Sequence, residues 1–393
     1  MLSRIIVLLS SSLFLSGGSR VENKNTPPQY KPAFSPKITA EKPISTTLKL
    51  MFAGDIMSQV PQIHSADLGN GQYDYTPCFQ YIRPILETAD LAIGNLECTL
   101  SEKPPYTGYP HFVSPNQLAK ALKINGFDVL VTSNNHTLDN GQYGLENTIE
   151  TLREQGFVQT GTFKNATYKT LLYPLIVYKN GFKIALLNYT HHTNGFKVSS
   201  PNIVNRLDMA VIKQDLEAAK KMKPDFIITF LHWGIEHIMV ENDNQRAIAK
   251  LLHQWGADLI VGSHPHVVQP IKMEHFKKND NVLVAYSLGN FISAQPFVHT
   301  EGGILFEVDI EKTDSGTKIS DYHYIPVLRY TPSHNGKMKF FALPVSPYEG
   351  NEKTLKMPHY ERVKMANFVQ RIRGQLDIHG AKEHKFTFKD IEY

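Results

Sequence analysis

Cysteine and tryptophan are scarce in this sequence, and neither sign of charge dominates it. There are two residues of each type, and the formal net charge is +4 over 393 residues. Cys78 and Cys98 are too few for a disulfide framework or a zinc-binding cysteine motif, although they could pair once in an oxidising compartment; packing in the core is the alternative. The small, mixed charge, without interleaved aromatic and basic residues, excludes nucleic acid as a partner. With 41% hydrophobic and 20% charged residues, the chain is typical of a soluble globular protein.

Long apolar runs are also missing, and the apolar segment near the N-terminus is short. A basic residue precedes Ile5 to Leu9, and serines separate this run from Leu13 to Leu15. The segment is shorter than a membrane span requires, and the small residues Ser16 to Ser19 fit a cleavage region, so residues 1–20 are predicted to be a secretory signal peptide. An uncleaved anchor is the alternative. Gly18 stands where a lipoprotein signal carries its lipidated cysteine, which argues against a lipid anchor.

The composition then changes along the chain and divides it into segments. Residues 21–46 are rich in proline, lysine, asparagine and serine, which predicts a disordered tether. We therefore expect an exported protein, periplasmic or associated with the cell surface, whose main domain covers residues 47–300. Residues 301–393 show strand patterns followed by a helix around Glu361 to Leu376, and we expect them to complete the same domain.

Short apolar runs alternate with helical patterns from Leu48 onward, which predicts an α/β fold with buried parallel strands. An Asn180-Gly181 turn between two apolar runs predicts one antiparallel hairpin. Gly156 and Gly256 stand where helix C-caps are expected. The predicted strands of the parallel sheet are Leu48 to Ala53, Leu91 to Ile93, Val129 to Val131, Phe226 to Leu231, Leu259 to Val261 and Val282 to Tyr286.

Each of these strand-like runs is followed by a short polar cluster rich in residue types that bind metals. In an open α/β sheet the carboxyl ends of the strands face one crevice, so these distant clusters are predicted to converge. Alone, each cluster has a plainer explanation, such as a turn or a loop with local hydrogen bonds. Their joint placement is what predicts a shared site. The clusters are Gly54-Asp55, Gly94-Asn95-Leu96-Glu97, Ser133-Asn134-Asn135-His136, His232-Trp233-Gly234, Gly262-Ser263-His264-Pro265-His266 and Ser287-Leu288-Gly289-Asn290-Phe291.

The chemistry of these clusters favours a divalent transition metal. Neutral imidazoles, carboxylates and an amide oxygen together suit Mn, Fe or Zn better than Ca or Mg alone. His264 and His266 can both reach one site from a turn. Two further features are ambiguous: His191 and His192 either line the crevice or lie in an exposed loop, and Trp233 either stacks on a substrate or packs in the core.

Taken in order, these motifs resemble the CapA family, which is associated with capsule and poly-γ-glutamate synthesis and is similar to the calcineurin-like metallophosphoesterases. The resemblance runs from about Leu48 to Ser293 and includes Asp139 and Gly141 after the third cluster. It implies a four-layer α/β/β/α sandwich with a centre for two divalent ions, or for one ion where the first site is weakened.

The resemblance also implies a role for each residue. Asp55 and His266 would hold one metal, and Glu97 would bridge to a second. The second metal would be held by Asn135, His232 and His264, and His136 would stand at the position of the general acid. The sequence departs from the phosphoesterase pattern at Met57, where that superfamily has a histidine, and at Glu97, where it commonly has aspartate. Supporting or substrate-binding roles are expected for Asn95, Asn134, Asp139, Glu236 and Asn290.

Two functions follow as hypotheses. In the first, a metal-activated water attacks a phosphoryl or amide-type centre while His136 protonates the leaving group. In the second, the protein is a non-catalytic accessory subunit that binds or exports an anionic capsular polymer. Membrane-bound components of the polymer synthase are possible partners in either case. The loops Pro104 to His111 and Pro296 to Gly302, with Tyr106 and Tyr109, are expected to decide specificity.

Overall fold

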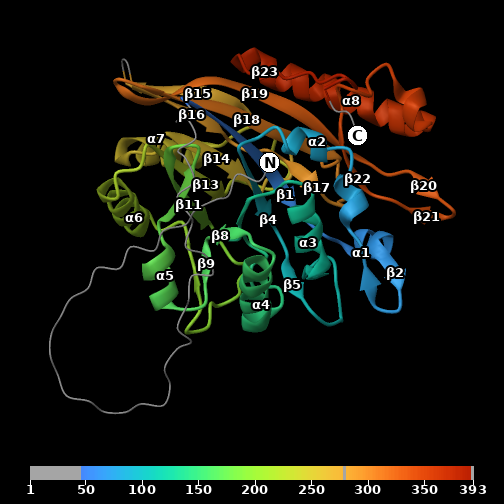
Figure 1. The fold of residues 1–393 in the computed structure, drawn as a ribbon, viewed down its shortest axis with the longest axis horizontal. Coiled ribbons are helices and arrows are strands. Elements are labelled where there is room, and N and C mark those ends of the chain that lie inside the picture. Colours follow the sequence, from blue (N-terminus) through green and yellow to red (C-terminus); the bar gives the residue numbers. More distant parts are fainter. Residues whose placement is uncertain (1–45, 278–279, 391–393) are drawn as a thin grey trace, which may run out of the picture.

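The computed structural model describes residues 46–277 and 280–390 (Figure 1). The predicted signal peptide and nearly all of the predicted tether lie outside these residues. No helix within the described ranges is both long and apolar enough to cross a membrane.

Two large β-sheets form the centre of the molecule. The first is nine-stranded, in the order β22-β19-β18-β1-β4-β7-β8, with β17 paired to β1 and β23 paired to β19. Strands β1, β4, β7 and β8 are parallel to one another, whereas β18 runs antiparallel to β1. Its strands are β1 (Thr47–Ile56), β4 (Leu91–Leu96), β7 (Val129–Val131), β8 (Val158–Thr160), β17 (Asn290–Ile292), β18 (Gly302–Thr313), β19 (Gly316–Tyr330), β22 (Phe341–Pro344) and β23 (Lys382–Glu383).

The second sheet is six-stranded, in the order β10-β11-β13-β14-β16-β15. Its four central strands are parallel, and the predicted hairpin at Asn180-Gly181 forms its β10–β11 edge. Its strands are β10 (Leu175–Lys179), β11 (Phe182–Thr190), β13 (Phe226–His232), β14 (Leu259–Ser263), β15 (Ile271–Lys277) and β16 (Asp280–Ala285). The strands predicted from the sequence as one crevice-forming set are therefore divided between two sheets.

The two sheets pack face to face, with helices on both outer faces. Alternate residues of β1 show the layering: Leu50 and Phe52 lie in the core between the sheets, and Met51 lies in the core beneath the outer helices. The predicted four-layer α/β/β/α sandwich is thus confirmed. The outer helices are α1 (Val60–Ala66), α2 (Arg83–Leu86), α3 (Gln117–Ile124) and α4 (Gly141–Glu154) on the first sheet, and α6 (Met209–Lys221) and α7 (Asp243–Trp255) on the second.

Local sequence signals place the helix ends. Asn242 and Gln245 form a reciprocal capping box at the start of α7, and Gly256 ends this helix in the left-handed conformation, as predicted. The side chain of Asp208 accepts hydrogen bonds from two backbone N–H groups at the start of α6. These caps fix where each crossover helix turns back toward its sheet.

Short elements connect the layers and lie mostly at the surface. They are β2 (Asp67–Gly69), β3 (Gln72–Tyr73), η1 (Thr76–Phe79), β5 (Thr99–Ser101), β6 (Val113–Pro115), β9 (Thr162–Phe163), α5 (Ala166–Leu172), β12 (Ile203–Val204), β20 (Ser333–His334), β21 (Lys337–Met338), η2 (Glu352–Leu355) and η3 (Asp377–His379). Strands β5 and β6 pair beside α4 and lead into the loop that borders the site.

The C-terminal segment belongs to the same core. Strand β18 extends the first sheet directly beside β1, and α8 (His359–Leu376) lies against β19 (Figure 1). One face of α8 enters the core between the sheets through Met365, Phe368, Val369, Ile372 and Leu376. This helix therefore covers an end of the inner core that the two sheets leave open.

Replacing Phe368 with alanine should destabilise the protein by about 3–5 kcal/mol, because its side chain is fully buried and would leave a cavity. Val363 lies on the same helix with 44% of its surface exposed. Val363→Ala should change the free energy of unfolding by about 0.5 kcal/mol or less. Guanidinium unfolding of both variants makes the comparison, and equal effects would show that α8 contributes no core packing.

Candidate metal centre

The six residues expected to be metal ligands meet where the two sheets present the carboxyl ends of their parallel strands. Asp55 lies at the end of β1 and Glu97 directly after β4, both in the first sheet. His232 is the last residue of β13, and His264 and His266 follow β14, all in the second sheet. Asn135 follows β7. All six are at most 3% exposed, so the site is a buried centre between the sheets.

These side chains form two groups that share one carboxylate. The candidate ligand atoms of Asp55, Glu97 and His266 lie within 4.8 Å of one another, and so do those of Glu97, His232 and His264. Asn135 belongs to the second group, because its Oδ1 lies 2.7 Å from Nε2 of His232. This division matches the assignment that the family resemblance implies, with Glu97 between the two groups.

Glu97 is the most unusual of these residues. It is fully buried, and neither of its carboxylate oxygens has a hydrogen-bond partner among the described residues. Its Oε1 lies 3.4 Å from Nε2 of His232 and 3.7 Å from Nε2 of His266. Burial, together with the neighbouring Asp55 carboxylate, raises the pKa of Glu97 well above its ordinary value. A cation at this point would supply the missing partner and restore the ionised form.

Two of the imidazoles beside Glu97, those of His232 and His264, are held neutral. Burial lowers the pKa values of His232 and His264 well below the ordinary value of histidine, although the Asp55 carboxylate acts in the opposite direction on His232. Burial would raise the pKa of Asp55, but the hydrogen bond and charge of His266 outweigh it and lower this pKa. Neutral imidazoles and an ionised carboxylate are the protonation states in which these residues bind metals.

A network of amides and a hydroxyl orients the candidate ligands. Asn95 donates from Nδ2 to Oδ1 of Asp55 over 2.8 Å, and Asn134 donates to the backbone oxygen of Leu96 over 2.7 Å. Nδ1 of His232 lies 3.0 Å from Oγ of Ser263, so its Nε2 faces Glu97 and Asn135. Such outer contacts fix the rings that would hold a metal.

His136 and Asp139 form a separate pair at the side of the centre. Nδ1 of His136 lies 2.7 Å from Oδ2 of Asp139, and the same oxygen accepts a hydrogen bond from the backbone N–H of Phe112 over 2.6 Å. The ring of Phe112 meets His136 edge to face, with 4.4 Å between the centroids. The His136 ring is thus fixed at one nitrogen, and its other nitrogen can exchange a proton with a bound group.

The backbone at the strand ends is as constrained as the side chains. His264 and His266 have φ angles of 101° and 60°, in the left-handed region that residues other than glycine seldom occupy. A Cβ atom at Gly54 would lie 2.0 Å from the backbone oxygen of Gly289, and one at Gly262 would lie 2.1 Å from that of Tyr286. These two glycines allow the neighbouring chain to cross close to Asp55 and His264.

Other residues singled out from the sequence occupy different places. Oδ1 of Asn290 lies 3.2 Å from Nδ1 of His266, because β17 pairs beside the end of β1. Glu236 is exposed, and the orienting contact to His232 comes instead from Ser263. Trp233 is buried, donates to the backbone oxygen of Tyr286 and stacks on its ring, so it packs in the core. Cys78 and Cys98 are free thiols.

Asn194 is a residue of the site that the sequence analysis missed. Its Oδ1 accepts from Nδ2 of Asn135 over 3.3 Å, and its Nδ2 lies 3.4 Å from Nδ1 of His136. It therefore links a candidate ligand to the candidate acid. The only sequence signal was the Asn194-Gly195 pair, which is typical of a turn, and Asn194 does have a φ angle of 47°.

Of the two loops predicted to decide specificity, Pro104 to His111 borders Asp139, the partner of His136, whereas Phe297 of the loop Pro296 to Gly302 lies beside His237. A pocket of about 610 Å³ opens beside Asp139, and Oδ1 of Asp139 is buried without a hydrogen-bond partner among the described residues. Tyr109 projects from the loop Pro104 to His111 with 83% of its surface exposed. The pocket is lined by residues that include Lys103, Pro104, Thr107, His111, Asp139 and Tyr143.

Comparison with known proteins gives a consistent result. Residues 49–295 match the family model described as "Bacterial capsule synthesis protein PGA_cap". The chain is 30% identical over 282 residues to the PGA biosynthesis protein CapA of Bacillus subtilis, which covers 68% of this chain and 69% of that protein. It is also 30% identical over 285 residues to the capsule biosynthesis protein CapA of Bacillus anthracis, covering 70% and 66% of the two chains.

Among solved structures, a calcineurin-like phosphoesterase of Bacillus subtilis, YfkN, matches 72% of this chain and 90% of its own, with 14% identity and a TM-score of 0.44. The family assignment rests on the sequence matches, and the residues matched by the family model include all six candidate ligands. This chain belongs to the family of bacterial capsule synthesis proteins that includes the CapA proteins.

Proposed function

We propose that this protein is an exported, metal-dependent hydrolase of the phosphoesterase type that acts in the biosynthesis of a capsule or of poly-γ-glutamate. The observation that carries the proposal is Glu97. A fully buried carboxylate without a hydrogen-bond partner among the described residues, beside the neutral imidazole of His232, is unfavourable by itself and favourable beside a cation. Its substrate would be a phosphoester or an amide-type bond of an anionic polymer.

The residues present fit one or two divalent ions, with Mn, Fe or Zn preferred. Asp55, Glu97 and His266 would hold one ion, and Glu97, Asn135, His232 and His264 the other. Such ions supply a Lewis acid and an activated water nucleophile. The chain itself supplies a dry, rigid frame in which Asn95 and Ser263 orient the ligands toward one point.

His136 is the residue of this chain best suited to move a proton. Its contact with the Asp139 carboxylate fixes the orientation of the ring. Phe112 and Asn194 restrict the ring on two further sides. An imidazole held in this way beside the candidate metal centre can donate a proton to a leaving group.

The biological setting follows from the relatives. Two proteins that resemble this chain over about two thirds of its length are named for PGA or capsule biosynthesis. Together with the predicted signal peptide, this supports export and an anionic polymer as substrate or ligand. Membrane-bound components of a polymer synthase are the partners we would expect for such a protein.

A second function is favoured by one specific feature, the methionine at position 57. Met57 is buried two residues beyond Asp55, where phosphoesterases have a histidine ligand, and a thioether is a weak ligand for Mn, Fe or Zn. A weakened first site favours a non-catalytic accessory subunit that binds or exports the polymer. Lys103 and His111 line the adjacent pocket, where they would contact the carboxylates of the polymer. Equilibrium binding of poly-γ-glutamate without release of shorter fragments would support this function.

Glu97→Gln should remove at least one equivalent of bound divalent metal, because glutamine keeps the size of the side chain and loses the charge between the two groups. Elemental analysis of full-length protein purified without chelators or a histidine tag makes the measurement. Glu154→Gln, on the exposed side of α4, is the matched control and should keep the metal content of the parent. Unchanged metal in Glu97→Gln would contradict the proposed centre.

His136→Ala should lower the rate of phosphodiester or γ-glutamyl hydrolysis by about 10²–10⁴-fold, because a positioned proton donor would be lost. Bound metal should stay at the level of the parent protein. Asp139→Asn should give a smaller loss, since the imidazole remains and only its orienting carboxylate is altered. An exposed histidine on α1, replaced in His64→Ala, is the control. Full activity in His136→Ala would exclude this residue as the proton donor.

A further inference from the structure

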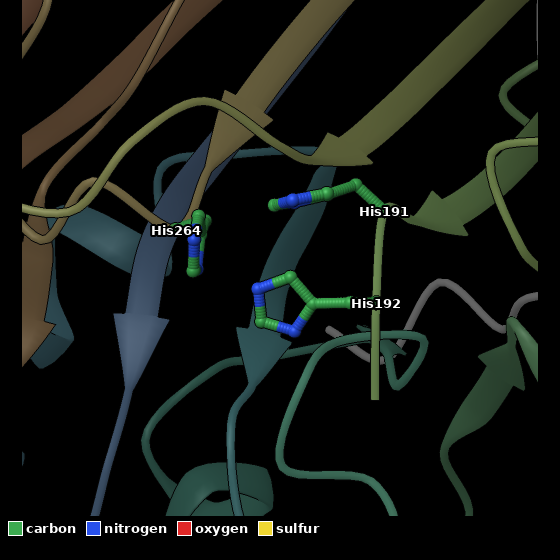
Figure 2. A group of neighbouring side chains, drawn as sticks. All are labelled: His191, His192 and His264. Atoms are coloured by element: carbon green, nitrogen blue, oxygen red, sulfur yellow. The ribbon is translucent and has the colours of Figure 1, made fainter. Parts of the chain in front are cut away.

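Three histidines gather outside the two candidate metal groups described above. They are His191, which is exposed, His192, which is partly exposed, and His264, which is buried (Figure 2). One ring nitrogen of each lies within 4.8 Å of one ring nitrogen of each of the others. Figure 2 shows the rings of His191 and His192 extending from the chain after β11 toward His264.

The sheet topology explains why these rings meet. Strands β11, β13 and β14 are neighbours in the second sheet, and Thr190 at the end of β11 is in register with His232. His232 is in turn in register with Ser263, the residue before His264. His191 and His264 therefore each come one residue after the end of a strand, on either side of β13.

The loop that carries His191 and His192 is held firmly. The backbone N–H of His191 donates to the backbone oxygen of His232 over 3.0 Å. Thr190 donates from its hydroxyl to the backbone oxygen of His192, and the backbone N–H of Asn194 donates to Nδ1 of His192 over 3.2 Å. Arg206 donates to the backbone oxygen of His191. The imidazoles are thus positioned by the backbone, which limits the entropy lost when an ion binds.

Packing alone does not account for this arrangement. The centroid of the His191 ring lies 4.2 Å from that of His192 and 5.5 Å from that of His264, and the His192 and His264 centroids are 5.3 Å apart. Two of these rings stand at the surface, where an imidazole gains little by burial. Three imidazole nitrogens within 4.8 Å of one another, two of them on side chains that reach solvent, are the kind of donor set that binds zinc and related ions.

We propose that His191, His192 and His264 form an outer binding site for a divalent transition metal of the zinc class. This site lies at the solvent-facing side of the buried groups and is reached before them from bulk water. Its remaining coordination positions can accept water or a carboxylate or phosphate oxygen of a ligand. Two charged side chains act on His192 at this side, the negative Glu236 and the positive Arg206.

The outer site shares His264 with the group of Glu97 and His232. A neutral imidazole has one free lone pair, so His264 serves one ion at a time. When His264 turns to the outer ion, the inner group keeps Glu97, His232 and Asn135. The outer site does not depend on the proposed hydrolase function, because its other two ligands belong to neither buried group.

The test is the number of Zn²⁺ ions bound by full-length protein, measured by calorimetric titration after removal of metals. The double variant His191→Ala/His192→Ala should bind one equivalent fewer than the parent chain. The matched control is His64→Ala/His334→Ala, which removes two exposed histidines far from the three rings in sequence and should lose none.

The same comparison in a Glu97→Gln background separates this proposal from the proposed function. If the buried centre binds no metal, the difference of one equivalent between parent and double variant should still appear. Equal stoichiometry with and without His191 and His192 would overturn the outer site, whatever the buried groups bind.

A second measurement covers the case in which the double variant does not fold. In the unmodified chain labelled with ¹⁵N-histidine, adding one equivalent of Zn²⁺ beyond the buried sites should shift the ring nitrogens of His191 and His192. Assignment uses the single variants His191→Asn and His192→Asn. The proposal would also be overturned if this equivalent binds while the ring-nitrogen signals of His191 and His192 stay unchanged.

Discussion

The arrangement at the strand ends depends on one buried carboxylate. Glu97 comes directly after a central strand of one sheet and faces imidazoles from the other, with no hydrogen bond to either of its oxygens within the described residues. Burying a carboxylate in this way costs free energy unless a positive charge stands beside it. Burial holds the neighbouring imidazoles of His232 and His264 neutral, so these two side chains do not provide that charge. The electrostatics of the site therefore call for a cation.

The sandwich makes this arrangement possible because it joins two mixed sheets whose parallel strands have their carboxyl ends on one side. One sheet contributes carboxylates and amides, through Asp55, Glu97 and Asn135, and the other contributes the imidazoles. The rigid core between the sheets, closed in part by α8, fixes the distance between these two sets of donors. Hard oxygen ligands and softer nitrogen ligands thus meet only when both sheets are packed.

Further side chains of the site surround the two buried groups of candidate ligands. Asn95 and Ser263 orient the candidate ligands, and Asn194 connects Asn135 to His136. The Asp139 carboxylate contacts His136 and lines an open pocket. On another side, the chain after β11 brings two more imidazoles close to His264. The buried candidate centre thus has His136 on one flank and the imidazoles of His191 and His192 on another.

The amino-acid sequence by itself determined the elements and the candidate ligands. Short apolar runs between helical patterns located β1, β4, β7, β13 and β14, and all six candidate ligands lie at the ends of these strands or shortly after them, because strand patterns and turn chemistry are local properties. Only the tertiary structure decided that these strands divide into two sheets. It also decided that Ser263 rather than Glu236 orients His232, and that Asn194 and His192 lie beside the centre. Those outcomes depend on which strands pair and how two faces pack, and contacts between residues distant in sequence leave no local pattern from which they could be predicted.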